Sequence, residues 1–343
     1  MKIAAQKKIV VSISLLCVLF VVFSLFRVFS GEWMLPQMFT VGPLSIRYYG
    51  ITMALAVGAG WWLALRRAPH YGFTGSQADI LFQWLVVAGF VGARLYHVAS
   101  SWQYYWQYPL DILKVWHGGL SIFGALIGGF LVVVIFVIKN KQIDFNEASA
   151  VIPSESSSRG ISITKAVDSS TPKATLGMTM LGEGNVQNSA FNILHLLDWL
   201  IPSVVLGQII GRLGNFFNYE AFGYPTTMPW KMFVPVQFRP EELVQYTFFH
   251  PLFLYEALGN VLILAVLLGC GRGKKWPVGQ LFFLYLFLYN TLRFALEFLR
   301  VDSTFLWGFI RLNTLSSAVL CLMGIAGLVL QFTYARKSDS YPE

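Results

Sequence analysis

Charged residues are scarce in this sequence. Only 12% of its 343 residues are Asp, Glu, Lys or Arg, whereas 56% are hydrophobic, and the mean hydropathy is +0.59. Soluble domains carry about 25% charged residues, so this composition excludes an ordinary water-soluble domain. The aromatic share of 16% fits a membrane protein, because Trp and Tyr gather at membrane interfaces.

Cysteine is also rare. The three cysteines, Cys17, Cys270 and Cys321, lie far apart, within or at the end of apolar runs. Their spacing matches neither a metal site nor a disulfide framework. No other motif demands a metal or an organic cofactor, so we expect none.

Long apolar runs make up most of the chain. Several reach the roughly 18–20 residues that cross a bilayer as a helix, and they are continuous rather than alternating, which argues against a β-barrel. We predict an all-α polytopic membrane protein with about eight transmembrane helices, a seven-span core preceded by one extra span. The predicted spans are about 9–29, 48–65, 78–99, 118–138, 193–210, 251–270, 279–300 and 313–333.

The net charge of +8 does not indicate nucleic acid binding, because the basic residues flank the spans. Cytoplasmic loops carry an excess of Lys and Arg. When the chain starts inside, every strongly basic flank falls inside: 2–8, 66–67, 139–141, 272–275 and 336–337. Both termini are therefore predicted to be cytoplasmic, and the polar ends of the spans described below face outward.

Composition also predicts the domain organisation. Residues 1–30 are expected to form an uncleaved signal-anchor span, because no small-residue cleavage site follows the apolar run. Residues 41–143 and 191–333 would form the transmembrane core, and 334–343 a cytoplasmic tail. The Ser- and Thr-rich residues 144–190 predict a flexible cytoplasmic insertion, with a small folded module as the alternative. The aromatic-rich residues 100–116 predict an interfacial piece on the outer leaflet.

One polar stretch ends the fifth predicted span. It reads Gly-Arg-Leu-Gly-Asn-Phe-Phe-Asn-Tyr-Glu-Ala-Phe-Gly, from Gly211 to Gly223. A cation, two amides and an acid fall within about two and a half helical turns: Arg212, Asn215, Asn218 and Glu220. Such groups are costly at a membrane span unless they meet partners or a polar ligand.

A second polar set lies on the seventh predicted span. Tyr289, Arg293, Glu297 and Arg300 are spaced by four, four and three residues, so on a helix they share one face. An Arg293–Glu297 pair that only neutralises itself is the alternative. However, two Arg–Glu sets on different helices exceed what helix packing needs, and the guanidinium fork matches phosphate. The two sets therefore predict a site for an anionic lipid headgroup.

Four other residues join this prediction. Tyr49 and Arg94 come from earlier spans, although Tyr49 could equally belong to an aromatic belt. Histidine is the side chain most easily used as a base near neutral pH. Of the five histidines, His117 and His250 lie nearest the predicted outer surface.

The stretch from Gly211 to Gly223 resembles the signature of the bacterial prolipoprotein diacylglyceryl transferase family. Four further stretches, in the same order, are similar to that family: 47–50, 118–121, 250–256 and 293–300. The likeness covers about 41–333, without the first span and the 144–190 insertion. The resemblance implies transfer of a diacylglyceryl group from phosphatidylglycerol to the lipobox cysteine of a prolipoprotein signal peptide. This first step of lipoprotein maturation would occur at the outer face of the bacterial cytoplasmic (inner) membrane.

The resemblance also implies roles for residues. Arg212 and Arg293 would be the essential arginines. His117 is not implied by the resemblance, and we take it as the candidate base because it lies a few residues before the position of the family's histidine. The expected substrate-binding residues are Tyr49, Arg94, Asn215, Asn218, Glu220, Gly223, His250, Tyr289, Glu297 and Arg300. The family commonly has a histidine where this chain has Phe123, and Phe cannot take a proton. Two other functions remain open: a transporter or flippase for an anionic amphiphile, and a homologue that has lost catalysis.

Overall fold

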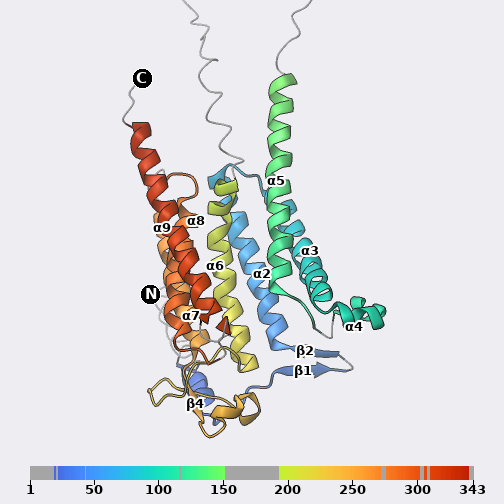
Figure 1. Ribbon diagram of the computed structural model, residues 1–343, viewed down its shortest axis with the longest axis vertical. Helices are drawn as coiled ribbons and strands as arrows, with labels where there is room; N and C mark the ends of the chain where they lie inside the picture. The colour runs from blue at the N-terminus through green and yellow to red at the C-terminus, as the bar shows by residue number, and fades with distance from the viewer. Residues whose placement is uncertain are drawn as a thin grey trace, which may run out of the picture. The chain divides into compact units, whose positions relative to one another are not determined.

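The computed structural model (Figure 1) describes residues 19–20, 22–42, 44–115, 118–150, 193–271, 276–301, 305–306 and 310–339. The chain divides into two compact units, one from Met1–Arg66 with Leu197–Glu343 and the other from Arg67–Leu196. The predicted membrane helix at 9–29 lies mostly outside the described residues, as do His117 and residues 151–190.

Six helices in the described part of the chain are long and apolar enough to cross a membrane. They cover Tyr48–Tyr71, Gly75–Ser100, Ile122–Lys139, Ile193–Asn218, Leu252–Cys270 and Leu312–Thr333. This result confirms an all-α polytopic membrane protein. The number of about eight spans stays a prediction; α8 (Gln280–Glu297) matches a predicted span but is not among the six.

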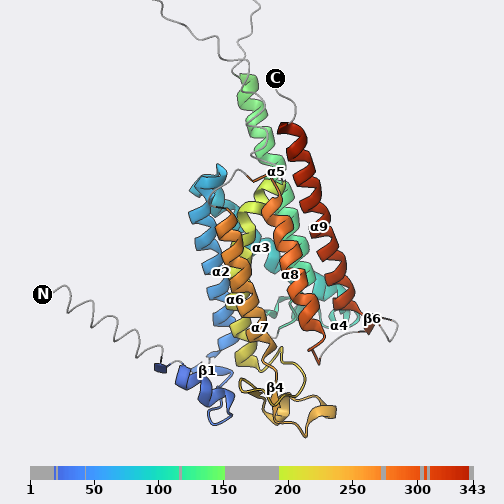
Figure 2. The same ribbon diagram turned by 90° about the vertical axis from the view of Figure 1, so that its left-hand side faces the viewer.

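The first unit contains α2 (Tyr48–Arg67, except its last residue), α6 (Ile193–Asn218, from Leu197 on), α7 (Leu252–Cys270), α8 and α9 (Leu312–Asp339). In this unit α6, α7 and α8 lie side by side (Figure 2). Trp199 of α6 is fully buried, and its Nε1–H donates to the carbonyl oxygen of Ala64 on α2 at 2.9 Å.

The start of α8 is capped by a carboxylate from α6. Asp198 is buried, and its two oxygens accept hydrogen bonds from the backbone N–H groups of Gly279 at 2.6 Å and Phe282 at 2.8 Å. Gly279 precedes the helix at φ 92°, a conformation that suits glycine and leaves no side chain to cap the helix. An anionic oxygen at a helix N-terminus satisfies orphan N–H donors and complements the helix dipole. Asp198 thereby fixes the position of α8 along α6.

Short antiparallel pairs organise the connections of this unit. They are β1 (Met38–Val41) with β2 (Leu44–Arg47), β3 (Met232–Phe233) with β4 (Phe248–Phe249), and β5 (Phe305–Leu306) with β6 (Ile310–Arg311). Two short 3₁₀ turns, Val236–Phe238 and Glu241–Leu243, lie between β3 and β4. A hydrophobic cluster packs the β3–β4 region onto α6 and α7, with buried members Val28, Phe216, Met232, Val234, Phe249 and Phe253.

The second unit contains α3 (Gly75–Ser100) and α5 (Ile122–Ala150), which pack closely at glycines. A Cβ on Gly92 would lie 2.4 Å from the carbonyl oxygen of Gly124, and one on Gly128 would lie 2.2 Å from that of Ala88. Small residues at these positions let the two backbones approach. Between the helices lie α4 (Trp102–Gln107) and the 3₁₀ turn Pro109–Leu113, and Ala68–Tyr71 forms another 3₁₀ turn before α3.

One predicted boundary is wrong. The helix α6 continues to Asn218, so the polar stretch from Gly211 begins inside a helix rather than after one. The helices α5 and α9 continue beyond their membrane-crossing parts, Ile122–Lys139 and Leu312–Thr333, to Ala150 and Asp339. The first residues of the predicted insertion from 144 and of the predicted tail from 334 are therefore helical.

Candidate functional site

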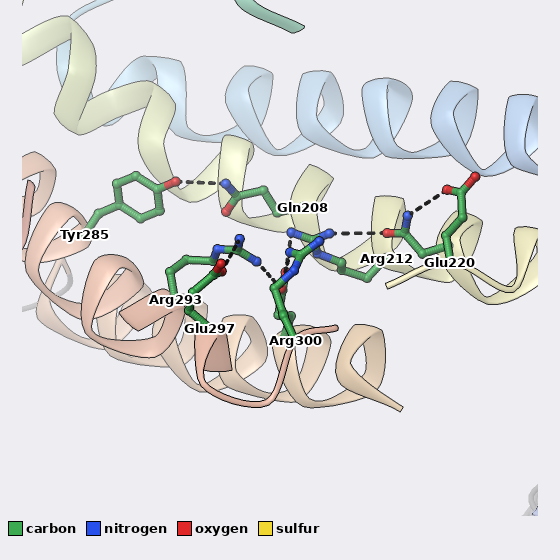
Figure 3. A network of polar contacts seen from close by, with 9 residues as sticks. Gln208, Arg212, Glu220, Tyr285, Arg293, Glu297 and Arg300 are labelled. Atoms are coloured by element: carbon green, nitrogen blue, oxygen red, sulfur yellow. Dashed lines mark hydrogen bonds and ion pairs between the residues drawn. The ribbon is translucent and has the colours of Figure 1, made fainter. Parts of the chain in front are cut away.

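One buried carboxylate joins three arginines in the first unit. Glu256 of α7 has a side chain that is 1% exposed. Its Oε2 pairs with Arg212 of α6 and its Oε1 pairs with Arg293 of α8. The Nη1 atom of Arg300 lies 3.9 Å from Oε1. Figure 3 shows Arg212, Arg293 and Arg300 converging on one place from different elements. The sequence predicted this convergence of Arg212 with Arg293.

A second carboxylate supports Arg293. Glu297 ends α8, is 1% exposed, and places Oε2 3.7 Å from Nη2 of Arg293. Its Oε1 accepts a hydrogen bond from Nδ2 of Asn313 at 3.3 Å, and its backbone oxygen accepts one from Nη1 of Arg311 at 2.6 Å. The start of α9 therefore holds the end of α8.

The arginine cluster carries more positive than negative charge. Three guanidinium groups, from Arg212, Arg293 and Arg300, face two carboxylates, which leaves a formal charge of +1 (three minus two). The carboxylates are almost fully buried, whereas the arginine side chains are 15–22% exposed. The cluster thus holds its negative charge inside and presents excess positive charge toward an accessible surface, as an anion-binding site requires.

Arg212 does not pair with Glu220, the acid nearest to it in the sequence. The carboxylate partner of Arg212 is Glu256. Glu220 instead accepts hydrogen bonds from Nδ2 of Asn215 and from Nδ2 of Asn218, both at 3.4 Å. The Nη1–H of Arg212 donates to Oδ1 of Asn215 at 3.3 Å, so Asn215 connects the arginine cluster to Glu220.

The backbone on both sides of Glu220 is in a conformation that L-residues rarely adopt. Tyr219 and Ala221 both have φ 54°, which costs of order 1–3 kcal/mol for each non-glycine residue. Packing compensates at Tyr219, whose ring stacks on Phe238 and whose hydroxyl accepts a hydrogen bond from the N–H of Leu35 at 3.1 Å. Burial raises the pKa of the Tyr219 hydroxyl, so it stays protonated. The positive φ angles follow the last residue of α6 and change the direction of the chain at Glu220.

Glu220 borders a hollow in the first unit. The hollow has a volume of about 480 Å³ and is lined by Gln37, Arg47, Asn218, Tyr219, Glu220, Ala221, Phe222, Phe238, Pro240 and Val301. Nε2 of Gln37 donates to the backbone oxygen of Asn218 at 3.4 Å, which joins the segment before β1 to the end of α6. The hollow is therefore walled by four parts of the chain, and Glu220 in its wall is linked to Arg212 through Asn215.

Arg300 does not share the helical face of Arg293, contrary to the sequence prediction. The helix α8 ends at Glu297, and Arg300 forms a β-bridge with Gly223. The N–H of Gly223 donates to the carbonyl oxygen of His250 at 2.8 Å. A Cβ on Gly223 would lie 2.5 Å from the carbonyl oxygen of Leu299, so only glycine fits without a shift. Gly223 therefore positions Arg300 through the backbone.

His250 is held by a neighbouring tyrosine. Its Nδ1 lies 3.0 Å from the hydroxyl of Tyr255, which also accepts a hydrogen bond from Nε1–H of Trp230 at 2.6 Å. Burial lowers the pKa of His250 below its usual value, so the ring is neutral at pH 7. His250, which directly precedes Pro251 and α7, is thus held by a protein side chain.

Two predicted tyrosines, Tyr49 and Tyr289, pack on or against the helices that carry the arginines. Tyr289 stacks on Tyr285 with ring centroids 5.3 Å apart, and the Tyr285 hydroxyl accepts a hydrogen bond from Nε2 of Gln208 at 2.9 Å. Tyr49 of α2 packs against α6, because a Cβ on Gly214 would lie 2.8 Å from its ring. Both tyrosines therefore lie on the helices that carry the arginines or directly against them.

Arg94 lies in the second unit and holds a loop. Its side chain is buried and stacks on Tyr105. Its guanidinium donates, at 2.6 to 3.5 Å, to five backbone carbonyl oxygens, those of Asp111, Ile112, Lys114, Gly118 and Gly119. An arginine has five N–H donors. Arg94 was predicted to bind the substrate with these donors, but here they bind the loop. We assign Arg94 to ordering the loop. His117 belongs to the same connection but lies outside the described residues, whereas Phe123 is described and 62% exposed.

The sequence reasoning did not select Glu256 as a site residue. It is the one acidic residue in the predicted span 251–270, and an intramembrane acid marks a functional site with a partner. An acid within an apolar span could therefore have been selected from the sequence. Which arginines Glu256 binds depends on how α6, α7 and α8 pack, and no short stretch of the sequence predicts that packing.

Comparison with known proteins gives a consistent result. A family model described as prolipoprotein diacylglyceryl transferase matches residues 36–154 and 173–330. The phosphatidylglycerol–prolipoprotein diacylglyceryl transferase of Synechococcus elongatus is 36% identical over 299 residues, which cover 86% of each chain. The enzymes of that name from Synechocystis and Thermotoga maritima are each 34% identical; the matches cover 92% of this chain and 97% and 92% of the relatives, respectively.

Proposed function

This chain belongs to the prolipoprotein diacylglyceryl transferase family, and on that premise we propose that it transfers a diacylglyceryl group from phosphatidylglycerol to the lipobox cysteine thiol of a prolipoprotein. The observation that carries the proposal is the convergence of Arg212 and Arg293 on one buried carboxylate. Charged groups are expensive within membrane spans and mark functional sites.

The chemistry explains why arginines are needed. The thiol sulfur attacks the glyceryl carbon next to the phosphate, and the C–O bond to that phosphate breaks. The phosphodiester carries one negative charge, and the departing glycerol phosphate gains a second. Donors that bind the growing charge better than the ground state accelerate the step. Arg212 and Arg293 are suited to this role, because their guanidinium groups bind phosphate oxygens in a planar, two-pronged manner.

Glu256 gives the cluster its geometry. It holds guanidinium groups from α6 and α8 on its two oxygens, so the arginines are positioned before the lipid arrives. A preorganised set of donors needs no reorganisation at the moment of reaction. Glu297 supports Arg293 in the same way, and Gly223 positions Arg300. We assign phosphate binding to Arg212, Arg293 and Arg300 and positioning to Glu256, Glu297 and Gly223.

We place the reaction at the outer leaflet of the bacterial cytoplasmic membrane. Tyr49 at the start of α2 packs against Gly214, two residues after Arg212 along α6, whereas Arg66 lies at the other end of α2. Arg66 is part of a basic flank that the positive-inside rule assigns to the cytoplasm. The cluster then faces the opposite side, where the cysteine of an exported prolipoprotein would be presented.

The test is direct transfer by the purified protein. The full chain is incubated with phosphatidylglycerol and a peptide that carries a lipobox cysteine, and the peptide mass is measured. We expect an added diacylglyceryl group and release of glycerol phosphate. Movement of lipid across a vesicle bilayer without a modified peptide would instead indicate a transporter. Binding of phosphatidylglycerol with neither product nor movement would indicate a homologue that has lost catalysis.

A further inference from the structure

We propose that Glu220 accepts the proton of the cysteine thiol during transfer. The proposal rests on the function proposed above and adds to it the catalytic base. A thiolate is the nucleophilic form of cysteine, and the thiol has a reference pKa of about 8.5. A base placed beside the thiol therefore accelerates its attack at neutral pH.

The first observation is accessibility. Among the described residues that line the hollow at the end of α6, Glu220 is the sole carboxylate. The hollow of about 480 Å³ is large enough to receive a small side chain and the peptide backbone that carries it. Glu256 and Glu297 differ in both respects, since each is 1% exposed and paired with arginine. Of these three acids near the cluster, Glu220 is the one exposed to an arriving substrate.

The second observation is the direction of the hydrogen bonds. Arg212 can only donate, so it fixes Oδ1 of Asn215 as the acceptor and turns the amide nitrogen toward Glu220. Asn218 also presents its amide nitrogen to Glu220. Both carboxylate oxygens of Glu220 therefore act as acceptors toward the protein. Each oxygen has a further lone pair, which is available to a proton arriving from the hollow.

The third observation is the strained backbone. The residues on either side of Glu220, Tyr219 and Ala221, are both held at φ 54°. Such conformations persist only where the surrounding structure enforces them, and they cluster at active sites. Here Tyr219 is enforced by its stacking on Phe238 and its contact with Leu35. The enforced backbone holds Glu220 where its carboxylate faces the amides of Asn215 and Asn218.

The step balances in atoms and charge. The sulfur lone pair forms the S–C bond to the glyceryl carbon, and the electron pair of the broken C–O bond remains on the phosphate of the leaving glycerol phosphate. The thiol proton passes to an oxygen of Glu220. A phosphodiester and a carboxylate, each singly negative, become a doubly negative phosphomonoester and a neutral acid. The proton then leaves through the hollow, which restores the carboxylate for the next turnover.

The experiment compares two nucleophiles in one assay. Full-length wild type and Glu220→Gln are given phosphatidylglycerol and either a cysteine peptide or the same peptide with selenocysteine. A selenol is already ionised at neutral pH and needs no base. General bases contribute about 10²–10⁴-fold, so we expect Glu220→Gln to lose at least about 100-fold with the cysteine peptide. With selenocysteine it should retain most of the wild-type rate. Glu241→Gln is the control, since Glu241 is an exposed acid of the same unit that does not line the hollow.

Three results would overturn the proposal. The first is full activity of Glu220→Gln with the cysteine peptide. The second is an equal loss with both nucleophiles, because a purely structural role affects them alike. The third is an unchanged pH dependence of the cysteine reaction in Glu220→Gln. Absence of any transfer by the wild type would instead refute the proposed function, so the two failures are distinguishable.

Discussion

Arg293 of α8 and Glu256 of α7 form an ion pair in which the Glu256 side chain is 1% exposed and the Arg293 side chain is 15% exposed. Glu256 is therefore buried in the protein interior, whereas Arg293 remains partly accessible. In the proposed function, Glu256 holds this cation at a fixed place, from which Arg293 would contact the incoming phosphate.

Removing the charge of Glu256 should damage both folding and activity. Breaking a buried ion pair by removing one partner costs about 3–5 kcal/mol, because the remaining charge is uncompensated. In Glu256→Gln, Arg212 and Arg293 would also repel each other without their shared partner. We expect a lower melting temperature in detergent and loss of transfer. Glu241→Gln, at an exposed position, is the control, and equal melting temperatures for the two variants would contradict the assigned role.

Replacing either principal arginine by lysine should abolish most transfer while the protein still inserts. Lysine keeps the charge but loses the planar fork that contacts a carboxylate and a phosphate together. Removing one donor to a developing oxyanion costs about 10²–10³ in rate, and we expect that loss for Arg212→Lys and for Arg293→Lys. Arg66→Lys, at the far end of α2 and stacked on Trp62, should retain the wild-type rate. A normal rate for either cluster variant would argue strongly against phosphate binding there.

A methyl group at Gly223 should displace Arg300. The added Cβ would meet the carbonyl oxygen of Leu299 at 2.5 Å, and overpacking of this kind costs about 1–3 kcal/mol. We expect Gly223→Ala to lower the affinity for phosphatidylglycerol by moving the Arg300 bridge. Gly58→Ala is a matched control, because nothing lies within 4 Å of its added Cβ on α2. The prediction fails if both variants bind the lipid equally.

Arg94→Lys should loosen the loop between α3 and α5. Lysine cannot contact five carbonyl oxygens at once, and each hydrogen bond to a charged group is worth about 1.5–3 kcal/mol. We expect faster amide hydrogen exchange in residues 108–115 and 118–119, whose backbone Arg94 holds. A change in lipid affinity alone, with unaltered exchange, would instead return Arg94 to the substrate-binding residues.

Much of the architecture follows from the sequence because its signal is local. An apolar run of about 20 residues must form a helix in lipid, whatever its neighbours are. The continuous apolar segments therefore predict α2, α3, α5, α6, α7 and α9, with errors mainly at their ends. Arg212 and Arg293 could likewise be selected, since charges within apolar segments demand a partner.

The remaining features depend on contacts between distant segments. The partner of Arg212 is Glu256, which is 44 residues away (256 minus 212), rather than the nearby Glu220. The strand pairs β1–β2 and β3–β4 are only two to four residues long, too short for a period-2 pattern to reveal them. The strain at Tyr219 and Ala221 opposes their intrinsic backbone preferences, so no propensity argument predicts it.

The cap at Asp198 has a mechanical consequence for the arginines. Arg212 lies 14 residues after Asp198 on α6 (212 minus 198), and Arg293 lies 14 residues after Gly279, the residue that Asp198 caps (293 minus 279). At 1.5 Å per residue both lengths are about 21 Å. These two helical segments of equal length are thus joined at one end by the Asp198 cap and at the other by the ion pairs of Glu256. Sliding of α8 along α6 would break one of these links. Thickening or thinning of the surrounding bilayer should therefore tilt both helices together and leave the spacing of the guanidinium groups unchanged.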